Sequence, residues 1–91
     1  FCDKLGGKME HRLSDGTRVD CLTKTHSIEV KYPREYLDAV GQSLHYSIRT
    51  GKKAGIYLIV KKKIDIKYLR RLKRIAKKHK IDIFDKDGNL I

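Results

Sequence analysis

The sequence contains only two cysteines and no long apolar run. Cys2 and Cys21 are too few and too far apart to form a zinc ribbon or a CxxC redox motif. No apolar stretch approaches the roughly 18 residues that a membrane span requires, and no signal-peptide pattern is present. The four histidines are scattered without the spacing of a metal-binding set. These absences exclude zinc-stabilised modules, and we expect no membrane partner.

Acidic residues are scarce as well. The 91 residues include 22 lysines and arginines but only 11 aspartates and glutamates, which gives a formal net charge of +11. Solubility alone does not need so large an imbalance, so it indicates an anionic partner, and nucleic acid is the first candidate. With 40% hydrophobic residues, the chain can close one modest core. We therefore expect residues 1–91 to form a single domain.

The positive charge is concentrated in residues 61–80, which hold eleven basic residues and one acid, Asp65. The apolar residues of this segment recur at helical spacing, which predicts a helix over residues 65–79 with a basic outer face. Like charges three or four positions apart repel each other, so this face is either a merely solvated surface or a site for a polyanion. The candidate nucleic-acid-binding residues are Lys67, Arg70, Arg71, Arg74, Lys77 and Lys78.

Two short alternating segments predict a β-hairpin. Residues 18–22 and 27–32 alternate apolar and polar side chains with the period of strands. If residues 24 and 25 form the tip, counting back along both arms places Asp20 directly opposite Glu29. Facing carboxylates are destabilising unless a cation compensates them, so the pairing is a first indication of a metal.

The remaining segments predict a short helix, a long helix and two further strands. We expect a short, glycine-interrupted helix that ends near Arg12, with no strand ahead of the hairpin. Helical spacing predicts a helix over residues 35–51, and the apolar runs 54–60 and 81–84 predict a central strand and a last short one. The inward face of the first long helix is expected to carry Leu37, Val40, Leu44 and Ile48. This order indicates the α/β (α+β) class, with a small mixed β-sheet flanked by helices.

Asp20, followed by Glu29-Val30-Lys31, resembles the D…(D/E)XK signature of the PD-(D/E)XK nuclease superfamily. The alternation of the second strand puts Lys31 on the same face as Glu29. The resemblance implies a restriction-endonuclease-like αβββαβ core, and the expected elements match it except for one strand before the hairpin.

Two flanking features are similar to motifs of the same superfamily. Glu10 resembles an additional acid that many members carry on the helix before the hairpin. The segment from Gln42 to Tyr46 resembles the QxxxY motif of RecB-type nucleases, and residues four apart share one face of a helix. Taken singly, such residues are common on protein surfaces; their combined order is more specific.

The resemblance implies a Mg²⁺- or Mn²⁺-dependent nuclease that hydrolyses phosphodiester bonds. Mg²⁺ is typically held by one or two carboxylates together with substrate oxygens and water, which suits Asp20 and Glu29, with Glu10 as a further candidate ligand. Lys31 could orient or deprotonate the attacking water, or neutralise charge on the phosphate. Gln42 and Tyr46 would position substrate or water.

We expect DNA rather than RNA as the substrate. Two alternatives stay open. One is a nucleic-acid-binding module on the same fold whose site no longer cleaves its substrate, and the other is an RNA-cleaving toxin or effector domain. Homodimerisation is open as well, because the chain is so small.

Cys2 and Cys21 are either bonded to each other or two buried thiols. Cys21 lies on the strand face opposite Asp20, and the segment that begins near Cys2 is the nearest candidate to cover it. The chain does not start with methionine, and it is similar to small exported bacterial proteins of this superfamily. We therefore expect a disulfide and an exported, periplasmic or secreted protein; reduced thiols in a cytoplasmic nuclease are the alternative.

Overall fold

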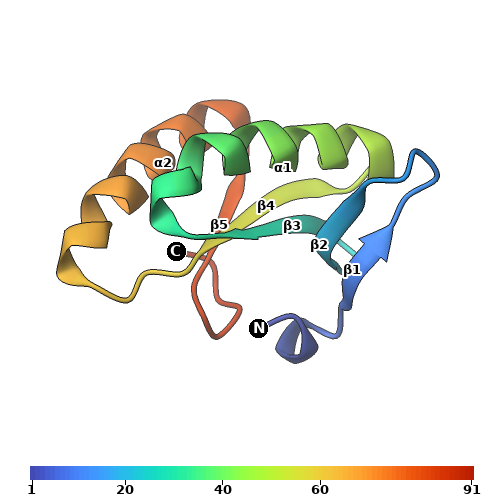
Figure 1. The fold of residues 1–91 in the computed structure, drawn as a ribbon, viewed down its shortest axis with the longest axis horizontal. Coiled ribbons are helices and arrows are strands. Elements are labelled where there is room, and N and C mark those ends of the chain that lie inside the picture. Colours follow the sequence, from blue (N-terminus) through green and yellow to red (C-terminus); the bar gives the residue numbers. More distant parts are fainter.

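A five-stranded mixed sheet forms the centre of the protein in the computed structural model, which describes all 91 residues (Figure 1). The strands lie in chain order across the sheet: β1 (Lys8–Arg12), β2 (Arg18–Leu22), β3 (His26–Lys31), β4 (Lys53–Leu58) and β5 (Asp82–Phe84). Strand β2 is antiparallel to both of its neighbours, β1 and β3, and β4 and β5 continue the sheet parallel to β3. The expected mixed sheet of the α+β class is confirmed.

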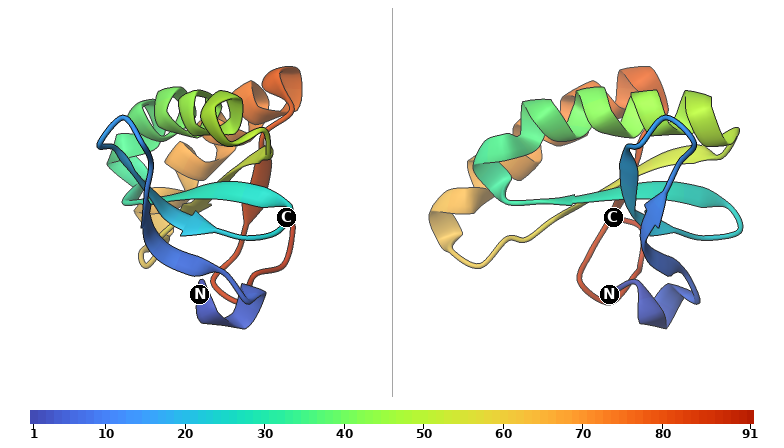
Figure 2. Two further views of the ribbon diagram at one scale, coloured as in Figure 1. Left: turned by 90° about the vertical axis from the view of Figure 1, so that its right-hand side faces the viewer. Right: turned by 45° about the vertical axis from the view of Figure 1, so that its right-hand side comes forward.

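Both long helices cover the same face of this sheet (Figures 1 and 2). Helix α1 (Tyr36–Thr50) connects the parallel strands β3 and β4, and α2 (Ile66–His79) connects β4 and β5. Each connection thus crosses over with a helix, as is usual between neighbouring parallel strands. The core between helices and sheet is built from eight buried residues: Ala39, Ala54, Ile56, Leu58, Leu72, Ala76, Ile81 and Ile83.

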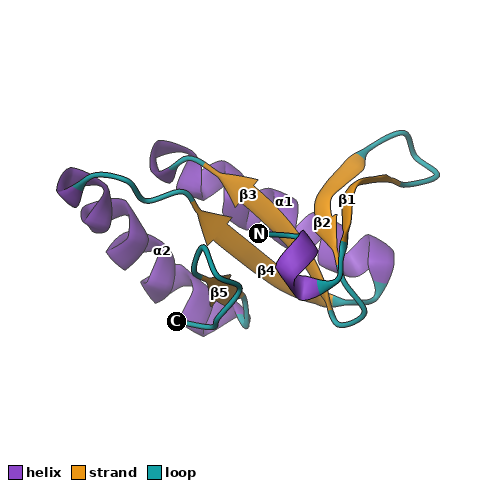
Figure 3. Ribbon diagram, turned by 90° about the horizontal axis from the view of Figure 1, so that it is seen from below, coloured by secondary structure: helices purple, strands orange, loops and turns teal.

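The opposite face of the sheet is covered by the chain termini instead of a helix (Figure 3). A second buried cluster there contains Cys2, Cys21, Ile28 and Phe84, and Phe1 stacks on Tyr57 with ring centroids 4.5 Å apart. Strand β4 is therefore covered on both faces, which confirms the prediction of a central strand from its continuous apolar run.

The prediction of an N-terminal helix is wrong. Only a short 3-10 turn, η1 (Asp3–Leu5), forms there, and Gly6 ends it with a left-handed φ of 67°. Residues Lys8–Arg12 form strand β1, which pairs with β2 and adds the strand that was not expected before the hairpin. Four of its five residues are exposed, so the segment shows no apolar alternation from which a strand could be predicted.

The predicted inward face of α1 is also partly wrong. Leu37 and Ile48 are 61% and 82% exposed. The residues that α1 buries are Ala39, Ser43 and Tyr46. Two of these are small, so the helix axis can approach the sheet closely on that side. The buried face is rotated away from Leu37 and Ile48, whereas Val40 and Leu44 pack against the core as predicted.

Cys2 and Cys21 form a disulfide with a Cα–Cα distance of 5.7 Å, and both side chains are buried. The expected bond is thus present, although Cys2 precedes a 3-10 turn and not a helix. Gly7 lies against the bond: a Cβ atom at this position would be 2.8 Å and 2.9 Å from the two sulfur atoms. No helix in the structure has both the length and the apolar character that crossing a membrane requires.

Candidate active site

The β2–β3 hairpin turns as the sequence predicts. The amide of Thr23 donates to the carbonyl of His26 at 2.9 Å, which leaves Lys24 and Thr25 at the tip. The Thr23 hydroxyl stabilises this turn by accepting the amides of Thr25 and His26. The paired strands then run in a register of Cys21 with Ile28 and Leu22 with Ser27. The regular pairing ends there, and its continuation by one position would place Asp20 opposite Glu29.

Beyond that pairing, the two acids themselves connect the strands. The amide of Val30 donates to Asp20 Oδ2 at 2.9 Å, and the amide of Asp20 donates to Glu29 Oε2 at 3.3 Å. Side-chain carboxylates thus replace the regular ladder bonds at the end of the hairpin. Each carboxylate keeps its second oxygen free of hydrogen bonds to the protein.

Glu29 is the most unusual ionisable group of the protein, because it is only 1% exposed and has no salt-bridge partner. Burial raises the pKa of its carboxyl to about 7, and the negative charge of Asp20 adds to the increase; the Asp20 amide and the Lys31 ammonium oppose it. Desolvation favours the neutral form of an acid, and a neighbouring like charge acts in the same direction. A cation between the two carboxylates would reverse both effects.

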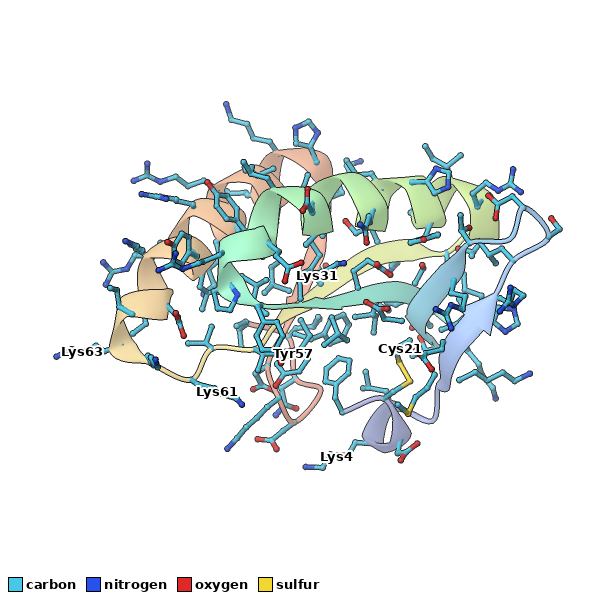
Figure 4. The ribbon with its side chains drawn as sticks, in the orientation of Figure 1. Lys4, Cys21, Lys31, Tyr57, Lys61 and Lys63 are labelled. Carbon is cyan, nitrogen blue, oxygen red and sulfur yellow. A yellow bond between two sulfur atoms is a disulfide. The ribbon has the colours of Figure 1, made fainter.

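Lys31 lies two residues after Glu29 on the same strand, so its side chain leaves the same, helix-covered face of the sheet (Figure 4). It is half-buried, and its positive charge acts on the Glu29 carboxylate. Ser27 lies two residues before Glu29 on this face, and its fully buried hydroxyl has no hydrogen-bond partner. The row therefore presents a hydroxyl, a carboxylate and an ammonium group.

Helix α1 crosses above this row. His45 and Arg49 of α1 lie 3.8 Å and 3.4 Å from Asp15, in the turn between β1 and β2. Gln42 lies one turn before His45 on the same side of the helix, and it is half-buried. This places Gln42 on the flank of α1 that faces the hairpin. Tyr46 is buried, which the proposed motif did not predict.

Glu10 lies on β1 and not on a helix, which corrects the position that the resemblance implied. The register of β1 and β2 around it places it opposite Asp20. Its backbone has a left-handed φ of 49°, unusual for a residue other than glycine, and its side chain is exposed. Glu10 and Asp20 both border a cavity of about 320 Å³.

The structure does not gather Glu10, Asp20 and Glu29 into one set of ligands. No group of three histidine, cysteine, aspartate or glutamate side chains is arranged to hold a metal ion. The set that it brings together is smaller: the carboxylates of Asp20 and Glu29, with Lys31 beside them on β3.

The basic residues of α2 are largely exposed as predicted, but they lie away from the acidic pair. Helix α2 sits over the β4–β5 side of the sheet, whereas Asp20 and Glu29 lie on β2 and β3, so α1 separates the two features (Figure 1). At the start of this basic face, Lys67 and Arg71 lie over the ring of Tyr68, 5.1 Å and 5.5 Å from its centroid.

Sequence reasoning missed a group of tyrosines at the carboxyl end of β3. Tyr32 directly follows Lys31 and is 59% exposed, and the rings of Tyr36 and Tyr68 lie 6.0 Å apart. Tyr32 and Tyr36 lie close together in the sequence, on either side of Pro33, whereas Tyr68 comes from α2. Only the exposed Tyr32 beside Lys31 could have drawn attention in the sequence, because the approach of α2 is a tertiary contact.

A comparison of the chain with models of known protein families found no match. Comparisons with curated proteins and with solved structures also found none.

Proposed function

We propose that the protein is a metal-dependent nuclease of the PD-(D/E)XK type that hydrolyses phosphodiester bonds, in DNA rather than RNA. One observation carries the proposal: two carboxylates, of Asp20 and Glu29, meet where the hairpin ladder opens, and Lys31 stands on the same strand face. A buried acid with a raised pKa next to a second acid is a common feature of functional sites. A structural ion pair does not explain the burial of these two acids, because neither of them has a basic partner within salt-bridge distance.

The donor set fits Mg²⁺ or Mn²⁺. Both ions prefer carboxylate oxygens, and Mg²⁺ commonly takes only one or two of them, with water and substrate phosphate as further ligands. Asp20 and Glu29 would hold the ion through the oxygens that make no hydrogen bond to the protein. When bound, the ion would supply stabilisation of the negative charge on the reacting phosphate.

The residues around the acids suit the rest of the reaction. The Lys31 ammonium would orient the attacking water or neutralise a phosphate oxygen, because it lies one strand repeat from Glu29. The amide of Gln42, on the hairpin-facing flank of α1, would position water or substrate. The buried Tyr46 would fix that part of α1 over β3. Glu10 would act at the edge of the site, beside Asp20.

The order of the elements supports the resemblance to PD-(D/E)XK nucleases. Three antiparallel strands, a helix and a strand parallel to the third follow each other as β1, β2, β3, α1 and β4. The elements expected from the sequence lacked one strand of the superfamily core, before the hairpin. Strand β1 is that strand. In the superfamily a helix precedes these strands, whereas the residues directly before β1 form the turn η1.

We further propose that the protein works in an oxidising compartment, as a periplasmic or secreted nuclease. The Cys2–Cys21 disulfide supports this location, because such bonds persist mainly in oxidising environments.

The direct test is incubation with plasmid, linear duplex, single-stranded DNA and RNA, each with Mg²⁺, Mn²⁺ or EDTA. We expect DNA cleavage with either ion and none with EDTA, and the loss of cleavage in Glu29→Gln and Asp20→Asn. Asp38→Asn is a matched control, because this acid is exposed on α1. Cleavage that survives Glu29→Gln at the wild-type rate would disprove the site. Binding of nucleic acid without cleavage would favour a non-catalytic module. Cleavage of RNA alone would favour an RNA-cleaving effector.

A further inference from the structure

Aromatic and basic side chains alternate at one end of the molecule, where β3 ends and both helices begin. Tyr32 follows β3 and is largely exposed, and Tyr36 opens α1. The ring of Tyr36 lies 6.0 Å from that of Tyr68, on the first turn of α2. Three of the five tyrosines of the chain are thus found at this end. Tyr36 is half-buried against the main core and Tyr68 is half-buried as well, so Tyr32, which is 59% exposed, is the one tyrosine of the three that core packing does not account for.

A cavity of about 370 Å³ lies beside Tyr32. Its basic lining residues are Arg34, Lys61 and Lys62, all of them exposed. Figure 4 shows Lys61 and Lys63 projecting into solvent from the loop between β4 and α2. Beyond this loop, Lys67 and Arg71 continue the positive charge to the ring of Tyr68.

The acids in this cavity only partly offset its positive charge. Asp65 lines it, but its Oδ2 accepts the amides of Lys61 and Lys62 at 3.3 Å and 3.1 Å, so this carboxylate is engaged in holding the loop. Glu35 is the other lining acid and is exposed. Positive side chains therefore outnumber acids around an exposed aromatic ring.

We propose that the surface around this cavity, formed by Tyr32, Arg34, Lys61 and Lys62, binds single-stranded nucleic acid. The combination of a basic groove with exposed aromatic rings is how proteins hold single strands, because each unpaired base offers a face for stacking. In a duplex the bases are stacked on each other and show only their edges, so Tyr32 has nothing to stack on. The exposed ring of Tyr32 thus favours an unpaired strand, whereas the lysines and arginines alone would not discriminate.

The surface lies at the end of the strand that carries Glu29 and Lys31, and in this respect the inference rests on the proposed nuclease function. Tyr32 lies three residues after Glu29 along the chain, or about 10 Å in an extended backbone. Lys31 lies between them. Successive side chains leave opposite faces of a strand, so Tyr32 and Lys31 lie on either side of the end of β3. A nucleic acid that stacks on Tyr32 and reaches Lys31 would have to bend around this end, so the proposed substrate is a flexible single strand or an unpaired end.

Binding can be tested separately from cleavage, in EDTA. The probes are a fluorescent oligothymidylate, an oligouridylate and a DNA duplex of the same length, measured by anisotropy. We expect the single strands to bind more tightly than the duplex. Tyr32→Leu should weaken single-strand binding roughly 5- to 150-fold, the usual effect of removing one stacked base, while Tyr32→Phe keeps the ring and should bind like the wild type.

Lys61→Gln should weaken binding to every probe, and Lys24→Gln, at the distant hairpin tip, should not. Unchanged single-strand affinity in Tyr32→Leu, or equal affinity for duplex and single strand, would overturn the inference. Glu29→Gln should bind the single strand as tightly as the wild type. Its loss of cleavage tests the nuclease site alone, so the two proposals can fail independently.

Discussion

The backbone amide of Asp20 donates to the carboxylate of Glu29 at 3.3 Å, and Asp20 in turn accepts the amide of Val30 at 2.9 Å. The two acids therefore hold the open end of the hairpin together at the position where they also repel each other. Desolvation and this repulsion both raise the pKa of Glu29, to about 7. The metal-free protein is thus strained electrostatically at the place where a cation is proposed to bind.

The stability of the metal-free protein should fall as the pH rises through the pKa of Glu29. The folded-state pKa of about 7 exceeds the ordinary value of 4.5, so the folded protein holds an extra proton between these values. The stabilisation is complete below about pH 4.5 and is lost as the pH rises through 7, with a magnitude on the order of 3 kcal/mol. Urea unfolding in EDTA from pH 5 to pH 8.5 measures it.

Glu29→Gln should remove most of this pH dependence and raise the stability at pH 8 above that of the wild type. Glu35→Gln, at an exposed glutamate, is the matched control and should keep the wild-type profile. Equal slopes in wild type and Glu29→Gln would contradict the assignment of the raised pKa to this carboxyl.

Mg²⁺ or Mn²⁺ should stabilise the wild-type protein at pH 8. A ligand at 100 times its Kd that binds only the folded state adds about 2.7 kcal/mol, which thermal unfolding detects easily. We expect the effect to be lost in Asp20→Asn and Glu29→Gln and retained in Asp38→Asn. An identical increase in Tm in the two site variants would place the cation elsewhere.

Lys31→Met should reduce cleavage by about 100-fold or more, the range for loss of a group that moves or orients a proton. The methionine keeps most of the length of the side chain, so folding should be preserved, as circular dichroism would check. Single-turnover rates at saturating DNA separate this effect from binding. Lys24→Met, at the hairpin tip, is the control; a wild-type rate in Lys31→Met would exclude a role for the ammonium group.

The hairpin and its acids could be predicted from the sequence because strand alternation and a two-residue turn together fix the register. Counting from Lys24 and Thr25 is enough to bring Asp20 opposite Glu29. The raised pKa of Glu29 could not be predicted in this way, since it depends on how closely α1 covers β3. That closeness follows from Ala39 and Ser43, which apolar spacing alone does not identify as the buried face.

The position of Glu10 could not be predicted for a different reason. Strand β1 is exposed along nearly its whole length, so it lacks the alternation that identifies a strand, and its pairing with β2 decides its structure. Likewise, Tyr68 reaches Tyr36 only through the packing of α2 against α1. Long-range contacts of this kind leave no local pattern in the sequence.

The basic face of α2 should contribute a sequence-independent attraction to nucleic acid. Replacing Arg70, Arg74 and Lys77 by glutamine should weaken binding to all sequences. Each ion pair with a phosphate that the substitutions remove should flatten the plot of log K against log salt by about 0.9 for duplex DNA and about 0.7 for single strands. The same number of changes at exposed lysines outside α2, Lys8, Lys24 and Lys53, serves as the control. A slope that is unchanged in the α2 variant would reduce this face to a solvated surface.

The disulfide should be important for both stability and the site, because Cys21 is the immediate neighbour of Asp20 on β2 and Cys2 holds the N-terminal turn beneath it. The bond joins residues 19 apart in sequence, and closing a loop of this size contributes about 3 kcal/mol in the chain-entropy model. Urea unfolding with and without a reductant should show a loss of that order. The double variant Cys2→Ser/Cys21→Ser should unfold like the reduced protein in both conditions.

Gly7→Ala tests the fit around the same bond, since the added Cβ would lie within 3 Å of both sulfur atoms. We expect this substitution to destabilise the oxidised protein more than it destabilises the Cys2→Ser/Cys21→Ser variant, in which no sulfur–sulfur bond fixes the two side chains. Mass spectrometry after alkylation of the unreduced protein checks the bond itself. Two alkylated thiols in protein purified from an oxidising compartment would contradict the disulfide and remove the main support for an exported nuclease.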